Sequence, residues 1–269
     1  MTLAVVWYRE KFGELWCAAD TRISGAEGVV TDSGPKIFPV PVICHEHLKE
    51  TKWRVCKRHS FGFVFAGNTL SATSTHALAS ACTQNFAQKK GYSKPVSLES
   101  IAQLYAEIGE CQVKDMSFRS GGADGFRYLF TAVIFGFCPS ESRYMAFVLS
   151  PSMPEGVFRM AVKRIVIEAG RYFPIGSGEA DFVALMGQLE DEPEAGVMTT
   201  FREMVKREVN QGVGGHLQIG VATKQGFKVV PVLDTSAGPG EAVVRFLGWN
   251  STDYKGVDGY TIGYRAIKP

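Results

Sequence analysis

The chain has 269 residues, of which 45% are apolar and 21% charged, proportions typical of a folded globular protein with an extensive core. Its formal net charge of +2 gives no indication of a nucleic-acid partner. No apolar run approaches the length of about 18 residues that a membrane-spanning helix needs. Because the 6 cysteines are scattered and no export signal precedes them, we expect reduced thiols in a cytoplasmic protein that binds neither membrane nor nucleic acid.

The first half of the chain is predicted to form strands followed by two helices. The expected strands span residues 2–8, 14–20, 36–43 and 61–66. Apolar residues at helical spacing predict a helix over 70–89, and Ser97 or Ser100 can cap a second helix. The stretch 114–126, rich in glycine, serine and aspartate, is expected to be a loop.

The second half repeats this alternation of strands and helices. Strands are expected over residues 128–137, 143–149, 164–169, 217–223 and 227–233, and helices over 181–189 and 197–209. This order predicts an α+β fold in which helices cover the outer faces of two sheets, a four-layer αββα sandwich. We assign residues 1–234 to this domain and residues 235–269, rich in glycine and aromatic side chains, to a C-terminal extension.

The beginning of the sequence offers a nucleophile. Met1 precedes a small residue, Thr2, and methionine in that position is normally removed. A free N-terminal threonine has a nucleophilic hydroxyl and an amine of pKa about 7.7–8 on one residue, so nucleophile and general base come together. The alternative is that Thr2 is an ordinary strand residue behind a retained Met1.

Five short motifs resemble, in order, those of proteasome-type N-terminal nucleophile (Ntn) hydrolases. They are Thr2, Ala18-Ala19-Asp20-Thr21-Arg22, Lys36-Ile37, Phe65-Ala66-Gly67 and Ile175-Gly176-Ser177-Gly178. Each motif alone is weak, but their order over residues 2–233, on the expected strands and helices, is fairly specific. The chain therefore resembles the simple bacterial homologues of the proteasome β subunit, and the resemblance implies the Ntn-hydrolase fold.

The resemblance implies a role for each matching residue. Thr2 would supply the attacking hydroxyl and, through its amine, the general base. Lys36 would favour the alkoxide and keep the amine neutral, and Asp20 would hold Lys36 charged and oriented. The Gly67 N–H would stabilise the oxyanion of the tetrahedral intermediate, and Ser177 would hydrogen-bond near the threonine amine.

The specificity pocket implied by the resemblance involves Ile23, Ser24, Phe38 and Thr69. Every catalytic assignment has a structural alternative: a turn cap for Asp20, a solvated edge lysine for Lys36, a tight turn for Gly67 and a helix N-cap for Ser177.

The chain departs from the family near its last helix. The family has Asp-x-x-Ser-Gly-Gly there, whereas this chain has Asn210, Val213 and the glycine pair Gly214-Gly215. Asn210 and Gly214 are retained as supporting residues of the site. Val213 cannot hydrogen-bond through its side chain, so the support of the threonine amine is weakened.

A second departure is the long connection between Lys36 and Gly67, which we interpret as an insertion at about residues 41–60. It contains Cys44-x-x-His47 and Cys56-x-x-His59, ligand types and a spacing that suit tetrahedral zinc. The alternative, which we favour, is a long hairpin whose charged residues face water. We therefore expect no metal and no cofactor.

The sequence thus predicts a threonine-type endopeptidase that is active only after removal of Met1. The resemblance implies a homo-oligomer built as a ring or stacked rings, a peptide or unfolded protein as the substrate, and an ATP-dependent unfoldase as a partner. Two alternatives stay open. The chain is a catalytically silent scaffold or gating subunit, as Asn210 and Val213 suggest, or it is an Ntn amidase that acts on a small amide.

Overall fold

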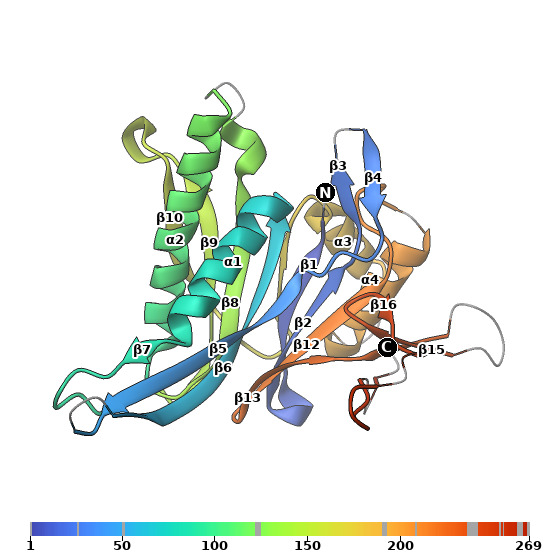
Figure 1. The fold of residues 1–269 in the computed structure, drawn as a ribbon. Coiled ribbons are helices and arrows are strands. Elements are labelled where there is room, and N and C mark those ends of the chain that lie inside the picture. Colours follow the sequence, from blue (N-terminus) through green and yellow to red (C-terminus); the bar gives the residue numbers. More distant parts are fainter. Residues whose placement is uncertain are drawn as a thin grey trace. The chain divides into compact units, whose positions relative to one another are not determined.

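The protein is described by a computed structural model that divides into two compact units. The described residues are 2–25, 27–49, 52–121, 125–189, 193–207, 209–235, 242–252, 254, 256–262 and 266–267. The first unit consists of Met1–Phe38, Glu168–Val221 and Lys228–Pro269, and the second of Pro39–Ile167 and Ala222–Phe227. Each unit combines a β-sheet with a pair of helices (Figure 1), so the fold is a mixed α+β fold.

The first unit contains a five-stranded sheet with the strand order β11-β1-β2-β12-β13. Its strands are β1 (Ala4–Arg9), β2 (Glu14–Asp20), β11 (Tyr172–Ile175), β12 (Leu217–Thr223) and β13 (Gly226–Val230). The end of β12, the turn and the start of β13, Ala222–Phe227, belong to the second unit. In the antiparallel register of β1, which lies between β11 and β2, Ala4 is opposite both Ala19 of β2 and Ile175 of β11. The start of β1, the end of β2 and the end of β11 therefore lie next to one another, at the same end of the strands of this sheet.

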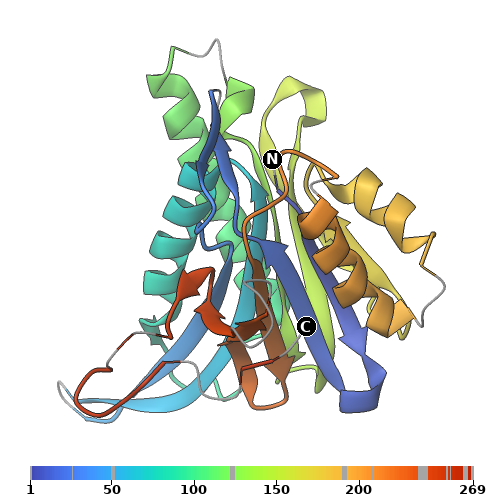
Figure 2. The same cartoon turned by 90° about the vertical axis from the view of Figure 1, so that its right-hand side faces the viewer.

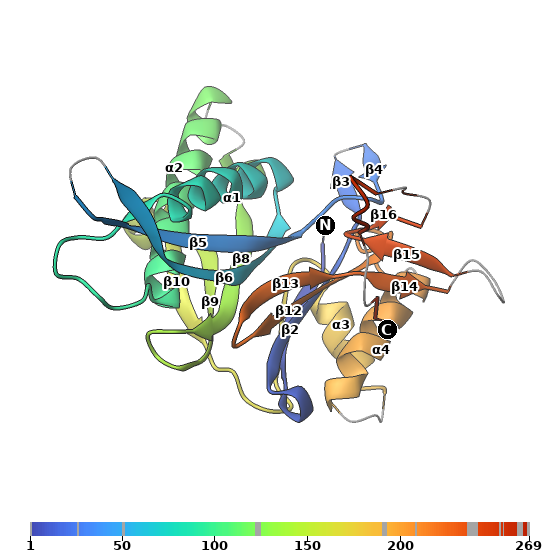
Figure 3. The ribbon, with the colours of Figure 1, turned by 60° about the horizontal axis from the view of Figure 1, so that its bottom comes forward.

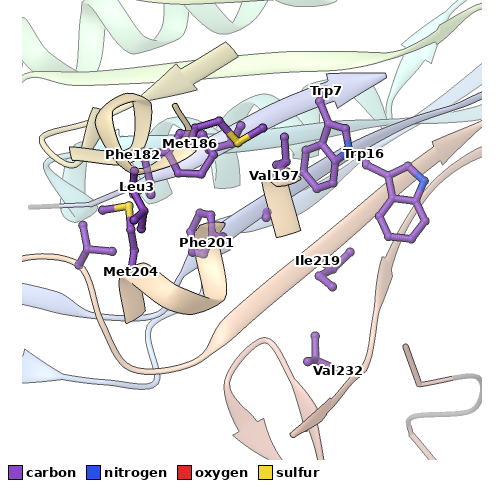
Figure 4. Close-up of a cluster of buried hydrophobic side chains, with 14 of the residues drawn as sticks. Leu3, Trp7, Trp16, Phe182, Met186, Val197, Phe201, Met204, Ile219 and Val232 are labelled. Atoms are coloured by element: carbon purple, nitrogen blue, oxygen red, sulfur yellow. The ribbon is translucent and has the colours of Figure 1, made fainter. Parts of the chain in front are cut away.

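Two helices, α3 (Glu179–Met186) and α4 (Pro193–Arg207), pack against the first sheet. Figure 4 shows Phe182 and Phe201 from these helices beside Leu3 of the segment that precedes β1, and all three side chains are fully buried. Burial of each of these side chains contributes roughly 1.5–3 kcal/mol. This core fixes the start of β1 against the two helices.

Part of the predicted C-terminal extension pairs with the end of the predicted main domain in a small antiparallel sheet of the same unit. The sheet consists of β14 (Val232–Asp234), which precedes the extension, and of β15 (Val243–Phe246) and β16 (Trp249–Asn250) within it. Ile267 pairs with β14, since its N–H donates to Pro231 O at 2.9 Å and its carbonyl accepts from Leu233 N at 2.8 Å. A short hairpin of β3 (Ile23–Gly25) and β4 (Gly28–Thr31) completes the strands of this unit.

The second unit contains a six-stranded sheet with the order β10-β9-β8-β6-β5-β7. Its strands are β5 (Ile37–His47), which begins in the first unit, β6 (Trp53–Gly67), β7 (Phe86–Ala87), β8 (Phe130–Cys138), β9 (Arg143–Ser152) and β10 (Arg159–Ile165). Helix α1 (Thr69–Thr83) contacts β6 and β8, and α2 (Leu98–Arg119) contacts β8, β9 and β10 (Figure 2). The predicted insertion at about 41–60 forms the outer part of the β5–β6 hairpin, and β7 pairs with β5 there. Figure 3 shows this hairpin beside the segment that follows α1.

Most of the expected elements are confirmed, but several differ. The helix expected over 70–89 ends at Thr83, and Phe86–Ala87 form β7 instead. The predicted loop over 114–126 is wrong at its start, because α2 continues to Arg119. Ion pairs with i,i+4 spacing join Lys114 to Glu110 and Arg119 to Asp115 on its exposed face. The strand expected over 164–169 instead spans Arg159–Ile165, and β11 was not predicted. Among the described helices, none has the length and apolar character that a membrane span requires.

Candidate active site

Thr2 lies immediately before β1 and is only 4% exposed. Its backbone nitrogen donates a hydrogen bond to Ser177 Oγ at 3.2 Å. Its carbonyl oxygen accepts one from Gly178 N at 3.3 Å. The Gly-Ser-Gly segment between β11 and α3 therefore holds the backbone of Thr2 from both sides. Met1 lies outside the described residues.

Asp20, the last residue of β2, is the most highly bonded side chain near Thr2. Its Oδ1 accepts from Leu3 N at 3.0 Å and from Lys36 Nζ at 2.8 Å. Its Oδ2 accepts from Arg22 N at 3.1 Å and from Gly214 N at 3.2 Å. One carboxylate thus connects the residue after Thr2, the lysine and the glycine pair.

Burial determines the electrostatics of the pair formed by Lys36 and Asp20, whose side chains are 1% and 0% exposed. Loss of water lowers the pKa of the Lys36 amino group, and the nearby Asp20 charge opposes this change. Burial raises the pKa of the Asp20 carboxyl, and Lys36 together with its backbone N–H partners opposes that change. Removal of either partner alone would leave a buried, unpaired charge, at a cost of about 3–5 kcal/mol.

Gln218, on β12, joins the segments that contain Asp20 and Lys36. Its Nε2 donates to Asp20 O at 3.0 Å and to Gly34 O at 2.9 Å, and its Oε1 accepts from Lys36 N at 3.0 Å. The side chain is 1% exposed. Gln218 was not predicted as a site residue, and the only sequence signal for it is a polar residue inside an otherwise apolar strand pattern.

Asn210 is committed to partners other than Thr2. Its Nδ2 donates to Asp181 Oδ2 at 2.7 Å, and its Oδ1 accepts from Gly212 N at 2.9 Å. Val213 is fully buried, and a Cβ added at Gly178 would meet its Cγ2 at 2.7 Å. These two positions therefore pack the loop before β12 onto the start of α3, and Gly214 contributes its N–H to Asp20.

Gly67 belongs to the second unit, whereas Thr2 belongs to the first. It is the last residue of β6 and has a φ of +102°. A Cβ there would lie 2.8 Å from Leu129 O, so only glycine fits this turn without strain. The structure explains why the position is glycine, while the oxyanion role of its N–H stays a prediction.

The residues predicted to bind substrate fall into both units. Ile23 and Ser24 are half-buried on β3, and Phe38 is half-buried near the start of β5, all in the first unit. Ile23 packs over Gly34, where a Cβ would lie 2.2 Å from Ile23 Cδ1. Thr69 is the first residue of α1, in the second unit.

The four candidate zinc ligands lie on the β5–β6 hairpin with partners of other kinds. Cys56 Sγ lies 3.3 Å from Cys44 O, and the ring of His47 packs on Trp53 with 5.0 Å between centroids. His59 Nε2 donates to Phe137 O at 2.9 Å. Among the residues that the structure describes, no three His, Cys, Asp or Glu side chains are grouped so as to hold a metal ion.

A cavity of about 620 Å³ in the first unit lies away from Thr2. Helix α4, the start of β12 and the small sheet of the C-terminal segment form its walls, which include His216, Asp234 and Arg245. Arg245 Nε donates to Asp234 Oδ2 at 2.6 Å, so these two charges of the lining are paired. This cavity, which Thr2 does not line, is therefore not evidence about the chemistry at Thr2.

Comparison with known proteins shows the fold alone. No family model matches the chain, and no curated protein is detectably similar to it. Among solved structures, a Gly-1 mutant of Anbu from Hyphomicrobium sp. strain MC1 is similar, with a TM-score of 0.52 and 15% identity over 86% of this chain and 85% of that one. Anbu from Yersinia bercovieri, described as an ancestral beta-subunit, gives a TM-score of 0.51 and 14% identity over 85% of this chain and 86% of that one. At this identity the similarity shows a proteasome-like fold and says nothing of activity.

Proposed function

We propose that the chain is a threonine peptidase that hydrolyses peptide bonds through Thr2 once Met1 has been removed. The observation that supports this most strongly is the set of contacts around Thr2. Its nitrogen bonds to Ser177 Oγ, and the neighbouring Leu3 N–H bonds to the same carboxylate oxygen that holds the buried Lys36 ammonium. A buried lysine is costly unless it has a function or a full set of partners, and this one shares its carboxylate oxygen with the residue that follows the candidate nucleophile.

The proposed reaction begins when the Thr2 amine takes the proton of its own hydroxyl. The oxygen attacks the peptide carbonyl and forms a tetrahedral intermediate, whose oxyanion the Gly67 N–H stabilises. The protonated Thr2 amine then donates the proton to the nitrogen of the cleaved peptide bond, which leaves as an amine. The acyl group stays on Thr2 as an ester. Water, deprotonated by the same amine, hydrolyses the ester. The positive charge of Lys36 favours the developing alkoxide throughout.

A second candidate function is a catalytically silent scaffold or gating subunit. The bonds of Asn210 to Asp181 and Gly212 favour this alternative, because they leave the amide of Asn210 engaged away from Thr2. The complete burial of Val213 favours it as well, since that position offers no hydroxyl to the amine.

Thr2→Ala and Thr2→Ser variants distinguish these functions. For a peptidase, Thr2→Ala loses turnover of fluorogenic peptides to background, while Thr2→Ser keeps a measurable fraction because its hydroxyl remains. Intact-mass spectrometry of each protein reports whether Met1 is present. Unchanged turnover in Thr2→Ala would exclude Thr2 as the nucleophile, and turnover of small amides but not of peptides would favour the amidase.

We also propose that the protein works as a homo-oligomer, arranged as a ring or stacked rings, and that an ATP-dependent unfoldase delivers its unfolded-protein substrate. Helix α1 supports the first part, because it contains no charged residue and leaves Leu70 and Leu78 59% and 47% exposed. Sedimentation velocity checks the assembly: a single species at the 29.4 kDa mass of one chain would contradict it.

A further inference from the structure

The second unit contains a cavity of about 310 Å³ at the base of the β5–β6 hairpin. It is lined by Val42, Cys44, Lys57, Arg58, His59, Phe61, Pro95, Val96, Phe137, Pro139 and Lys224. Its volume lies at the lower end of the range of roughly 300–1,000 Å³ found for small-molecule sites. None of the residues assigned to the proposed peptidase site lines it.

The charges around this cavity are all positive. Among the described residues, the lining includes Lys57, Arg58 and Lys224 and contains no aspartate or glutamate. Lys57 Nζ donates to Lys94 O at 2.9 Å, a neutral partner that leaves its charge uncompensated. Arg58 and Lys224 are exposed and form no ion pair with any described residue.

The position of Lys224 beside β6 is fixed by the backbone. Lys224 lies in the turn between β12 and β13, and the end of this turn is tied to β6 through Ser60. The Ser60 hydroxyl accepts from Phe227 N at 2.8 Å and donates to Phe227 O at 3.1 Å. Arg58 lies two residues before Ser60 on β6, and both Arg58 and Lys224 line the cavity.

The beginning of α2 adds to the positive potential. Pro95 and Val96 line the cavity and directly precede Ser97, the N-cap, whose Oγ accepts from Ser100 N at 3.1 Å. Helix α2 has 22 residues, and the positive pole of its dipole lies at this N-terminal end. The cavity therefore faces a helix end and three cationic side chains.

The remaining walls are apolar or neutral. Val42, Phe61, Phe137 and Pro139 provide aliphatic and aromatic surface. The Nε2–H of His59 donates to Phe137 O at 2.9 Å, and burial lowers the pKa of its ring. The His59 ring is thus uncharged at pH 7 and adds no charge to the cavity.

We propose that this cavity binds a small organic carboxylate with an apolar body. The planar fork of Arg58 suits a carboxylate, Lys224 adds a second cation, and the apolar walls receive the rest of the ligand. Such a carboxylate comes either from a free small molecule or from the C-terminus of a peptide. The proposal is independent of the activity at Thr2.

The test uses the full chain and titration calorimetry with four probes. They are 4-phenylbutyrate, its neutral amide, the peptide acetyl-Ala-Leu-Phe with a free carboxylate, and the same peptide as its C-terminal amide. The variant is Arg58→Glu with Lys224→Glu, and Arg58→Gln with Lys224→Gln repeats the test without charge reversal. The matched control is Lys163→Glu with Arg164→Glu, which changes the same residue types at two exposed positions of β10.

The expected result is that at least one acid binds at least tenfold more tightly than its amide. The cavity variants lose at least tenfold in affinity for that acid, and the β10 control stays within about twofold of the native chain. Binding of 4-phenylbutyrate identifies a free carboxylate as the ligand, and binding of the peptide acid alone identifies a C-terminus. Equal binding of acid and amide, no binding of either acid, or an equal loss in the control would overturn the proposal.

Discussion

The side chain of Gln218 holds together the backbone segments that contain Asp20 and Lys36. It bonds to the backbone of Asp20, Gly34 and Lys36 at 2.9–3.0 Å, and it is nearly inaccessible to solvent. A buried polar group that loses its partner costs about 1–3 kcal/mol. Gln218 is therefore a positioning residue, whose effect on the reaction passes through Lys36.

Gln218→Met is predicted to lower the free energy of unfolding by at least about 2 kcal/mol, because three backbone groups lose their partner. The proposed peptide turnover should fall at least tenfold in kcat, with little change in KM, since Lys36 moves and the substrate contacts do not. Urea denaturation and peptide kinetics measure both effects. Gln225→Met, at an exposed position, is the control, and an equal effect of both substitutions would refute a special role for Gln218.

Asn210 differs from the proteasome-type hydrolases that the sequence resembles, and its neighbours explain the difference. The family has an aspartate there, but in this chain Asp181 Oδ2 already lies 2.7 Å from Asn210 Nδ2. A carboxylate at position 210 would face another carboxylate at hydrogen-bond distance. The substitution that restores the family residue is thus expected to damage this protein.

Asn210→Asp is predicted to destabilise the protein more at pH 7 than at pH 4. The repulsion raises the pKa of one carboxyl in the folded state, so stability is kept at low pH, where a proton is shared, and is lost as the pH rises above about 4. Thermal unfolding at both pH values measures this. Asn250→Asp is the matched control, because Asn250 Oδ1 likewise accepts an N–H two residues ahead, from Thr252. A similar pH dependence in both variants would argue against the Asp181 contact.

At the scale of elements, α1 and β6 are joined by an aromatic cluster that includes a histidine. The His76 ring stacks on Phe63 with 5.2 Å between centroids, and its Nδ1 lies 3.3 Å from the Tyr105 hydroxyl of α2. Burial lowers the pKa of His76 to about 4 from an ordinary value of 6.5. This position makes His76 a packing residue of the cluster.

The His76 site is predicted to destabilise the protein in acid. An unfolded chain takes up a proton near pH 6.5 but the folded chain only near pH 4, so stability is fully present above pH 6.5 and falls as the pH drops toward 4. Between pH 7.5 and 4.5 this site should contribute a loss of about 2–3 kcal/mol. The His76→Leu variant should therefore have a weaker pH dependence in urea denaturation. If variant and native protein lose the same free energy, protonation of His76 is not the cause.

The elements that the sequence predicted best are those with a strong pattern. The β-strand over residues 14–20 and the N-cap at Ser97 appear where expected, since both depend on local residues. The end of α2 was missed because i,i+4 ion pairs, not apolar spacing, hold its last turns. Strand β11 was missed because Pro174 and two aromatic residues give no alternation, and only pairing with β1 makes it a strand.

The candidate site could be predicted only in part for the same reason. Thr2, Asp20, Lys36 and Ser177 were found from short motifs, and the structure brings their segments together. Gln218 had no motif, and its role comes from three contacts with residues far away in sequence. The actual partner of Asn210 could not be foreseen, because Asp181 approaches it through the packing of α3 on the loop before β12.

At the scale of the molecule, the C-terminal segment reaches the candidate site. Gly248, between β15 and β16, has a φ of +87°, and a Cβ there would lie 2.7 Å from Thr21 Cγ2. The Thr21 hydroxyl accepts from His216 N at 2.6 Å and donates to Asp32 O at 2.5 Å. The predicted extension thus packs on the residue that follows Asp20.

Gly248→Ala is predicted to lower both the melting temperature and the proposed peptide turnover, because the methyl group strains the turn and displaces Thr21. Gly259→Ala is the matched control: its φ of +83° is nearly the same, but a Cβ there has no atom within 4 Å. The control experiences only the backbone strain of about 1–2 kcal/mol. Equal activity of the two variants would show that the segment does not influence the site.

Covalent labelling of Thr2 tests most directly whether the chain is a threonine peptidase. A peptide epoxyketone reacts with both the amine and the hydroxyl of a free N-terminal threonine, so it reports Met1 removal and nucleophilicity together. If Thr2 is the nucleophile, we expect one adduct per chain in the intact mass. Tandem mass spectrometry should locate the adduct at Thr2, and the Thr2→Ala variant should have none. An unlabelled chain that retains Met1, or a chain without Met1 that stays unlabelled, would contradict this proposal.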